Sequence, residues 1–390
     1  MTRWFGLLVA ALQTALAFRV VARLARTARG ERIGPAPAGT ATGTATGTAT
    51  GRISIVVPVL DEAERLDPCL AGLHAQGAEV AEILIVDGGS TDATRDLVRA
   101  WAMRDRRVRL VEAGPAPTGA NGKVHNLIHG LAAADPTTTW LLTIDADVRP
   151  RPGMARALLA FAGSRHLRAL SVATQQRLSG PVEALLHPAM LATLVYRFGI
   201  PGAATADPAL VQANGQCMLL RRDLLEATGG FTSLTGEIAE DVALARRIAA
   251  QGEPVGFYEA GDLVEVAMYR GAAEAWRNWT RSLPLRDARW GWAGRLGLLE
   301  ILLVQALPLP LLLWLAVRGQ AGTIHGRLNL VLALVRLGVL VGTARAYVAP
   351  PFTFWLSPVS DLAVALALPF QAFRRRHLWR GRSVVRGGPR

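Results

Sequence analysis

The sequence predicts an α/β domain with a mixed, mainly parallel sheet, joined to an N-terminal membrane anchor and C-terminal transmembrane helices. Three observations lead to this prediction. Short apolar runs rich in β-branched residues alternate with helix-forming segments over residues 52–270. Residues 4–22 and several stretches after residue 290 are long and apolar. Between anchor and domain, residues 35–51 repeat Gly, Thr and Ala, a composition typical of a flexible linker.

The individual elements follow from hydrophobic periodicity and from the residues that begin or end each segment. Strands are predicted at 53–57, 83–86, 108–110 and 140–144, and helices at 61–76, 91–102 and 123–134. Pro58 is expected to end the ladder of the first strand, because proline has no N–H to donate. Ser90, Thr91 or Asp92 is expected to cap the helix that begins there.

The apolar segments and the basic residues together indicate a membrane protein. Residues 296–317 and 328–347 are predicted spans, whereas residues 359–373 could span, re-enter or lie in the interface. Most of the net charge of +13 comes from arginines that flank apolar segments, including the tail from residue 374 on. With a cytoplasmic domain, three C-terminal spans would place this tail outside and two would keep it inside, so both topologies stay open.

These features divide the chain into five predicted parts. They are an anchor at 1–23, a basic and Gly/Thr/Ala-rich linker at 24–51, the α/β domain at 52–290, two or three membrane segments at 291–375 and a basic tail at 376–390. No basic stripe interleaved with aromatic residues occurs in the central region, which argues against nucleic-acid binding despite the high net charge.

Cysteine and lysine usage is informative in this chain. Cys69 and Cys217 lie far apart without metal-ligand spacing, so we expect small core residues in a reducing compartment and no zinc site. The chain has 42 arginines but a single lysine, Lys123. We interpret Lys123 as a position that requires a compact point charge, with compositional chance as the alternative.

The strand predicted at residues 140–144 ends in two carboxylates, Asp145 and Asp147. Side chains at positions i and i+2 of an extended segment point the same way, so both carboxylates face a common point. Like charges repel there unless a cation lies between them. A hard divalent cation held by one or two carboxylates and by substrate phosphates would resolve this repulsion. A solvated turn is the alternative for this pattern alone.

Two further polar clusters follow predicted strands. Pro58, Asp61 and Glu62 follow the first strand, and residues 87–92 follow the second. Each cluster alone is ordinary, because Asp and Gly are common turn residues. Open α/β sheets bind ligands at the carboxyl ends of their strands, so we expect these clusters and the carboxylate pair to form one site.

The order of these motifs resembles that of family 2 glycosyltransferases with the GT-A fold. The matching motifs are V-V-P-x-x-D-E at 56–62, I-V-D-G-G-S-T-D-x-T at 85–94, G-K-x-x-N at 122–126, D-A-D at 145–147 and E-D-x-x-L-A-R-R at 240–247. The resemblance covers residues 52–270. It implies inverting transfer of a sugar from a nucleotide donor, usually a UDP-sugar, with Mg²⁺ or Mn²⁺ as the cofactor.

On the donor side, the resemblance implies a nucleotide pocket lined by Pro58, Asp61 and Glu62. Asp87 would hydrogen-bond the uracil or the ribose. Lys123 would approach the uridine or the diphosphate. The sequence D-G-G-S after the second strand departs from the family's commoner D-D-x-S.

The metal and the reacting groups are implied by two acidic motifs. Asp145 and Asp147 would lie at the ribose and the metal, with Asp147 as the expected principal ligand of a cation that neutralises the leaving diphosphate. Asp241 matches the family's catalytic base, which takes the proton of the acceptor hydroxyl, and Glu240 precedes it in the same motif. Taken alone, this acidic pair is better explained by the attraction of acids to a helix N-terminus.

The acceptor side is implied by residues 212–222, in which Gly215 would let the backbone approach the sugar and Gln216 follows it. Arg277 or Arg281 would meet the diphosphate, in a segment that stands where many members carry Q-x-x-R-W. The match to that motif is incomplete, and an amphipathic interfacial helix is the alternative.

The predicted architecture resembles that of the lipid-directed members of the family, because it combines one anchor, a cytoplasmic GT-A domain and a short hydrophobic bundle. These members include ceramide glucosyltransferase-like, carotenoid-associated and hopanoid-associated enzymes. The resemblance implies transfer of one hexose, with glucose expected, from a UDP-sugar to a hydroxyl of a membrane lipid. We therefore expect a multi-pass protein of the cell (inner) membrane with no nucleic-acid partner. A processive polysaccharide synthase, a polyprenyl-phosphate glycosyltransferase and a catalytically silent scaffold are the alternatives.

Overall fold

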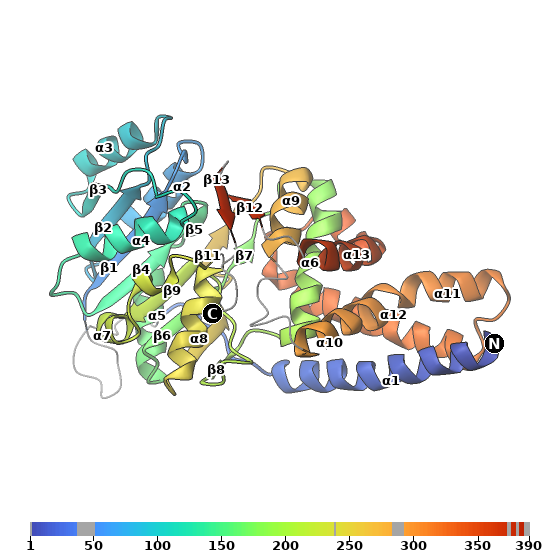
Figure 1. The fold of residues 1–390 in the computed structure, drawn as a ribbon. Coiled ribbons are helices and arrows are strands. Elements are labelled where there is room, and N and C mark those ends of the chain that lie inside the picture. The colour runs from blue at the N-terminus through green and yellow to red at the C-terminus, as the bar shows by residue number, and fades with distance from the viewer. Residues whose placement is uncertain are drawn as a thin grey trace. The chain divides into compact units, whose positions relative to one another are not determined.

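The structure is a computed structural model that describes residues 2–36, 51–237, 239–282, 292–372, 376–379 and 382–385. The chain forms two compact units (Figure 1). The helical unit comprises residues 1–30, 177–200 and 268–374, and the sheet unit comprises residues 31–176, 201–267 and 375–390. Residues 177–200 thus leave the sheet unit and return to it, an excursion that the sequence analysis did not anticipate.

The sheet unit is built on an eight-stranded sheet of order β3-β2-β1-β4-β9-β6-β10-β8. Its strands are β1 (Ile53–Val59), β2 (Val80–Asp87), β3 (Val108–Glu112), β4 (Trp140–Ile144), β6 (Ala169–Ala173), β8 (Ala203–Thr205), β9 (Cys217–Arg221) and β10 (Val255–Glu259). Strands β3, β2, β1 and β4 are mutually parallel, as are β6 and β10. Strand β9 is antiparallel to β4 and β6, and β8 is antiparallel to β10. The predicted mixed, mainly parallel sheet is confirmed.

Helices connect the parallel strands and pack on the sheet. They are α2 (Leu66–His74), α3 (Thr94–Arg104), α4 (Gly122–Ala133), α5 (Met154–Ser164), α7 (Arg222–Ala227), the 3₁₀ helix η1 (Phe231–Leu234) and α8 (Glu240–Ala250). Helices α4 and α8 share one apolar core with β1 and β2. A small sheet of β5 (Val148–Pro150), β11 (Val264–Val266) and β7 (Gln175–Gln176) and a hairpin of β12 (Arg376–Trp379) and β13 (Arg382–Val385) complete the unit.

Strand β4 has the predicted bounds, and all five of its residues are buried. Strand β1, in contrast, continues past Pro58, contrary to the prediction. It pairs with β2 as far as Val59 but with β4 only as far as Val56. The proline therefore lies where β1 has a single hydrogen-bonding neighbour, a position that tolerates the loss of one N–H.

Two predicted helices begin later than expected. Helix α2 starts at Leu66 rather than at residue 61, because Asp61 has φ +52°, in the left-handed region that an α-helix cannot use. Helix α3 starts at Thr94, and its N-cap Ala93 has no side chain that could cap it. Asp92 instead accepts a hydrogen bond from the N–H of Thr94 at 3.0 Å.

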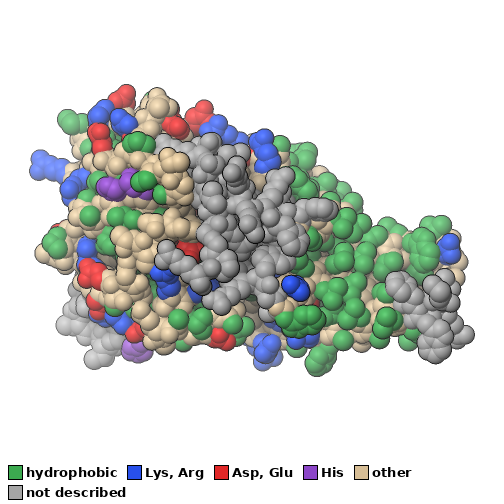
Figure 2. Space-filling view, viewed as in Figure 1, with side chains coloured by type: hydrophobic (Ala, Val, Ile, Leu, Met, Phe, Trp, Pro, Cys, Tyr) green, Lys and Arg blue, Asp and Glu red, His purple; other side chains and the backbone are tan. Residues whose placement is uncertain are grey.

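The helical unit contains the apolar segments from both ends of the chain. Its elements are α1 (Thr2–Thr27), α6 (Pro181–Phe198), α9 (Ala272–Ser282), α10 (Trp292–Glu300), the π-helix η3 (Ile301–Ala306), α11 (Pro308–Val317), α12 (Ile324–Thr343), the 3₁₀ helices η4 (Ala344–Ala346) and η5 (Phe352–Ser360), and α13 (Asp361–Ala372). Figure 2 shows hydrophobic side chains gathered over α11 and α12 on the visible face. The predicted apolar helices near both ends are confirmed.

Several of these helices are long enough to cross a bilayer. Among the described residues, Gly6–Thr27, Ile324–Ala346 and Phe352–Pro369 meet that requirement in length and composition. The segment predicted at 296–317 is instead two helices bent by 40°, which would add a fourth span if counted as one. The number of spans is therefore three or four by these criteria.

Helix α1 is an integral member of the helical unit. Its Leu16 and Val20 belong to the same buried cluster as Tyr196 of α6 and Leu332 of α12. The buried carboxylate of Glu300 pairs with Arg19 at 3.0 Å and with Arg23 at 2.9 Å. This ion pair explains why arginines interrupt an otherwise apolar segment.

Candidate active site

The site begins where β4 ends, beside the segment that leads into β9. The antiparallel pairing sets Ile144 opposite Cys217, and the N–H of Asp145 donates to the carbonyl of Gln216 at 3.1 Å. All five residues of β4 are buried in the sheet, and Asp145 is the first residue after the strand, at its carboxyl end. Asp145 is thereby fixed next to residues 214–216, which the sequence analysis assigned to the acceptor side.

Lys123 lies at the centre of this site. Asn121 caps α4 by accepting from the N–H groups of Lys123 and Val124, so the lysine occupies the first turn of a fixed helix. Its Nζ lies 2.6 Å from Asp145 Oδ1 and 3.0 Å from Glu240 Oε1. Burial lowers the pKa of Lys123, but the two carboxylates raise it more, so the net pKa is well above the ordinary value.

Glu240 and Asp241 occupy the first turn of α8, as the motif predicted. Asp241 Oδ2 accepts the N–H of Gly215 at 2.8 Å. Burial raises the pKa of Glu240, Lys123 lowers it and Asp241 raises it again, with a net upward shift. The helix N-terminus favours both acids, so the dipole explanation and the functional one coexist here.

Gly215 connects the two halves of the site through a single residue. Its N–H binds Asp241, and its carbonyl accepts from Lys123 Nζ at 3.2 Å. A Cβ at this position would lie 2.9 Å from Lys123 Nζ and 3.1 Å from the Cβ of Asp241. The structure therefore explains this glycine by the close approach of two side chains, in addition to the sugar approach that the sequence suggested.

Gln216 supports the same segment from behind. Its Oε1 accepts from Thr174 Oγ1 at 2.6 Å and from Asn214 Nδ2 at 2.8 Å, and the side chain is buried. Ser171 Oγ also accepts the N–H of Asn214 at 2.7 Å. Sequence reasoning missed the contributions of Ser171 and Thr174, because their partners lie more than 40 residues away along the chain.

Asp147 is the best candidate for a metal ligand. Its Oδ1 is buried and has no hydrogen-bond partner among the described residues. Burial, then the carboxylates of Asp145 and Glu62, raise the pKa of Asp147 to about 7, because each of these disfavours its charged form. A divalent cation would relieve both effects.

The donor set fits Mg²⁺ or Mn²⁺, which prefer carboxylate oxygens and accept phosphate oxygens as further ligands. Within the described ranges, no group of three His, Cys, Asp or Glu side chains is arranged to hold a metal by itself. A cation here would therefore use one or two protein carboxylates and take its other ligands from the substrate. We refer to Asp145, Asp147, Glu240 and Asp241 as the acidic cluster.

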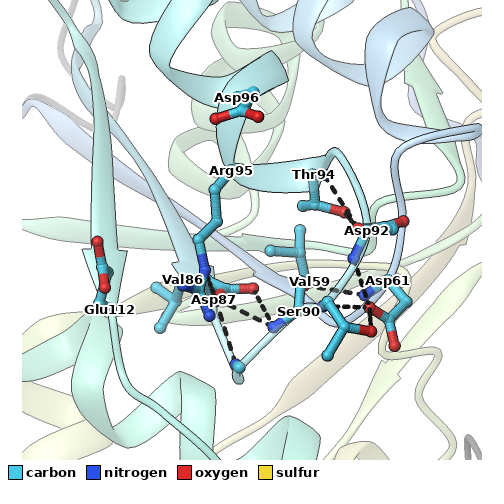
Figure 3. Close-up of polar contacts among 12 residues, drawn as sticks. Val59, Asp61, Val86, Asp87, Ser90, Asp92, Thr94, Arg95, Asp96 and Glu112 are labelled. Carbon is cyan, nitrogen blue, oxygen red and sulfur yellow. Dashed lines mark hydrogen bonds and ion pairs between the residues drawn. The ribbon is translucent and has the colours of Figure 1, made fainter.

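The residues predicted to bind the nucleotide include a hydrogen-bonded network in the turns after β1 and β2 (Figure 3). The Asp87 carboxylate accepts the N–H of Ser90 at 3.0 Å and lies 2.7 Å from Arg95 Nε. Asp61 Oδ1 accepts the N–H of Thr91 at 2.7 Å, and the Asp61 N–H donates to Ser90 Oγ. Both carboxylates thus hold these turns in place, and their role in binding a nucleotide stays a prediction.

The remaining predicted pocket residues lie at the ends of the same strands. Pro58 is half-buried in β1, and Glu62 is buried with its N–H donating to Thr94 Oγ1 at 2.9 Å. Asn126 of the G-K-x-x-N motif, to which we assigned no role, donates to the carbonyls of Val59 and Val86, and it ties β1 to β2.

Asn126 also explains the glycine that departs from the family motif after β2. A Cβ on Gly88 would lie 3.0 Å from the amide atoms of Asn126. A larger residue at position 88 would therefore press on the side chain that joins the two strands.

Arg277 and Arg281 belong to the helical unit. Both lie on α9, where Arg277 is exposed. The side chain of Arg281 lies outside the described residues, and a role for either arginine at the diphosphate stays a prediction. Cys69 and Cys217 are buried free thiols, as expected, and burial and Asp145 raise the pKa of Cys217 to about 12.

Comparison with known proteins shows that this chain is similar to glycosyltransferases. The model of the family described as glycosyl transferase family 21 matches residues 8–388. The motifs had suggested family 2. A segment of 59 residues is 37% identical to the glycosyltransferase GlyG of Streptococcus pneumoniae serotype 4, which is 15% of this chain and 20% of GlyG. The chain therefore spans a fifth of the length of that curated relative.

The chain is also similar to solved structures. The mannosyltransferase PcManGT from Pyrobaculum calidifontis, in complex with GDP-Man and Mn²⁺, has a TM-score of 0.54 at 20% identity, and the match covers 93% of this chain and 98% of that one. Glucosyl-3-phosphoglycerate synthase from Mycobacterium tuberculosis has a TM-score of 0.40 at 20% identity, over 62% of this chain and 82% of that one. The likeness to PcManGT confirms the predicted GT-A-like fold.

Proposed function

Because this chain belongs to glycosyl transferase family 21, we propose that it transfers a single hexose, with inversion, from a UDP-sugar to a hydroxyl of a membrane lipid. Glucose is the expected hexose. The observation that carries the proposal is the meeting of Lys123, the acidic cluster and Gly215 at one sheet edge. This arrangement brings the ammonium of Lys123, a candidate base and a surplus of carboxylates within a few ångströms of one another.

Asp241 is the proposed base. The N–H of Gly215 holds Oδ2 at 2.8 Å, which orients the carboxylate without taking its charge. In the proposed reaction, Asp241 accepts the proton of the lipid hydroxyl while that oxygen attacks the anomeric carbon from the side opposite the diphosphate, which inverts the configuration.

Lys123 keeps its positive charge throughout, because its pKa is well above the ordinary value. We propose that it favours the diphosphate electrostatically while it bridges Asp145 and Glu240. A divalent cation bound by Asp147 would supply additional neutralisation of the leaving diphosphate. The complex of PcManGT with GDP-Man and Mn²⁺ is consistent with this cofactor class.

A lipid acceptor is proposed because the helical unit contains several helices that could cross a bilayer. A lipid dissolved in the membrane presents its hydroxyl at the interface, and membrane helices in the same chain would hold the enzyme there. We propose an inner-membrane protein with the sheet unit in the cytoplasm, where UDP-sugars are available. This orientation agrees with the arginines that follow the first apolar segment.

The test is an Asp241→Asn variant of the full chain. Asparagine keeps an oxygen that can accept the N–H of Gly215 but cannot take a proton. We expect the dissociation constant of UDP, measured by calorimetry with Mn²⁺, to change by less than about threefold, which is a small part of the binding free energy. Transfer to extracted membrane lipids, followed by mass spectrometry, should fall by about 10²–10⁴-fold.

Asp223→Asn is the matched control, since Asp223 is half exposed and pairs with Arg221 and Arg168 at the surface. It should change neither property. Full turnover by Asp241→Asn would remove Asp241 as the base. A polymer or a hexosyl-phosphoryl lipid as the wild-type product would replace the proposed function by one of its alternatives.

A further inference from the structure

The helical unit contains a broken helix with a polar side chain at the break. Helix α10 continues into the π-helix η3, and α11 begins at Pro308 after a bend of 40°. Gln305 lies in this π-helix and is buried. Irregular backbone in a membrane segment is tolerated only where it is covered by protein or lines a polar cavity, and π-helical turns frequently mark functional sites.

Gln305 contacts a buried ion pair. Its Nε2 donates to the carbonyl of Ala189 at 3.0 Å and to Asp361 Oδ1 at 2.9 Å, which fixes the orientation of the amide because both partners are acceptors. Asp361 binds Arg336 through Nε at 2.7 Å and Nη2 at 3.1 Å. Arg336 and Asp361 are only 2% and 1% exposed, so their charges cancel inside an apolar bundle.

Tyr196 belongs to the same neighbourhood. It shares a buried apolar cluster with Leu332 and Val339, which lie about one turn on either side of Arg336 on α12, and with Val304, which precedes Gln305. Tyr196 also lies within electrostatic range of Arg336 and Asp361. We call Tyr196, Gln305, Arg336 and Asp361 the Arg336 cluster.

Three buried atoms of the Arg336 cluster have no hydrogen-bond partner among the described residues. They are the Tyr196 hydroxyl, Gln305 Oε1 and Arg336 Nη1. Each unmatched buried polar atom costs about 1–3 kcal/mol in proteins, and hydrocarbon offers no solvent to reduce this cost. The three atoms offer one donor, one acceptor and one group that can do both. They are therefore complementary to a group that donates and accepts hydrogen bonds at once.

We propose that the Arg336 cluster binds the hydroxyl or amide group of an uncharged membrane lipid. The absence of net charge decides between lipid classes. Asp361 already takes two of the three Arg336 nitrogens, so an anionic headgroup would have to compete with a bidentate carboxylate. An uncharged polar group meets only the unmatched atoms.

The proposal rests on the proposed function in one respect, which is that the helical unit lies in a bilayer. Two sources of the same chemistry are open to it, namely the lipid that accepts the sugar and a resident lipid that the enzyme does not modify. Binding is measured without any sugar donor, so loss of the site and loss of the proposed transferase activity are separate results.

The experiment places the full-length protein in phosphatidylcholine nanodiscs that contain one of three probes with identical acyl chains. The probes are dioleoylglycerol, its acetyl ester, which lacks the hydroxyl donor, and dioleoyl phosphatidic acid. Retention is read by native mass spectrometry. We expect dioleoylglycerol to be retained about three- to tenfold better than the other two, the effect of one or two hydrogen bonds.

Tyr196→Phe is the decisive variant, because it removes a hydroxyl that has no protein partner. It should abolish this preference and leave the melting temperature in lipid-free detergent unchanged or higher. Arg336→Lys is the second variant, since it keeps the charge opposite Asp361 but lacks Nη1, and it should also reduce the preference.

Tyr347→Phe is the matched control in the same unit, because the Tyr347 hydroxyl lies 3.0 Å from His187 Nδ1. It should lower the melting temperature and leave the preference intact. Equal retention of the three probes by the wild type, or an unchanged preference in Tyr196→Phe, would overturn the proposal.

If the retained lipid gains a hexose when UDP-glucose is added, the site serves the acceptor. If it does not, the site holds a resident lipid. Either result supports the site.

Discussion

Both units bury charged side chains, but they balance those charges differently. In the sheet unit, the acidic cluster gathers around one ammonium, that of Lys123. In the helical unit, Asp361 is matched by Arg336, and Glu300 by two arginines of α1. The acidic cluster therefore carries surplus negative charge, whereas arginines match or outnumber the carboxylates of Asp361 and Glu300.

The difference separates sites that need a charged ligand from sites that do not. Buried carboxylates in surplus repel each other until a cation arrives, which is the situation of Asp147. A balanced pair is complete in charge and can lack only hydrogen bonds, which is the situation of the Arg336 cluster. Surplus negative charge thus favours a metal cation, through which a diphosphate can bind, and unmatched neutral atoms favour an uncharged polar group.

The largest expected effect comes from breaking the balanced pair. Asp361→Ala leaves the Arg336 guanidinium buried without its counter-ion, which should lower the free energy of unfolding by about 3–5 kcal/mol. The double variant Arg336→Met with Asp361→Leu removes both charges and should cost less than about 1.5 kcal/mol, since apolar replacements of a buried pair are often neutral. Denaturant unfolding in detergent measures both, and equal losses would contradict the pairing argument.

Much of the sheet unit could be predicted from sequence because its signals are local. A buried run of five residues followed by Asp145 gave β4 its bounds, and the motif order gave the residues that meet Lys123. The start of α2 could not be predicted, because nothing local distinguishes the left-handed Asp61 from a helical one. The second role of Gly215 required knowledge of which side chains approach it from other elements.

Less of the helical unit could be predicted, because its polar pairs join distant segments. Arg336 lies within one predicted apolar segment, 328–347, and Asp361 lies near the start of another, 359–373. Glu300 lies 277 residues from Arg23, so no spacing rule connects them. The apolar pattern located the helices, but the partners that bury their charges emerge only from packing.

The next effect in size tests the surplus charge directly. Asp147→Ala should weaken Mn²⁺-dependent UDP binding by about 100-fold, or about 2.7 kcal/mol, because it removes the principal proposed ligand. The metal-free protein should be as stable as the wild type or more stable, since a repelled carboxylate is gone. Calorimetry with Mn²⁺ or EDTA and thermal unfolding measure the two properties.

Asp105→Ala is the matched control, because Asp105 is also an aspartate of the sheet unit, but it is buried and paired with Arg107 and His74. Side-chain hydrogen bonds from Arg107 hold the pKa of Asp105 well below its usual value, although burial opposes them. Its removal should reduce stability and leave UDP binding unchanged. Unchanged binding in Asp147→Ala would exclude Asp147 from the metal site.

The smallest expected effect is a pH dependence that has opposite signs for the two acids. Burial and the neighbouring carboxylates raise the pKa of Asp147 from 3.8 to about 7 in the folded, metal-free protein. Between these values the folded chain holds a proton that the unfolded chain has released, so stability falls as pH rises through this window and levels off above it. Asp105, whose pKa is depressed, instead contributes stability that is lost only as the pH falls below its ordinary value of 3.8. The measurement is the difference in melting temperature between the wild type and Asp147→Asn. In EDTA, this difference should decline by roughly a few degrees from pH 5 to pH 8. Addition of Mn²⁺ with UDP should remove the decline. A flat difference would mean that the carboxylates around Asp147 do not repel it in the folded state.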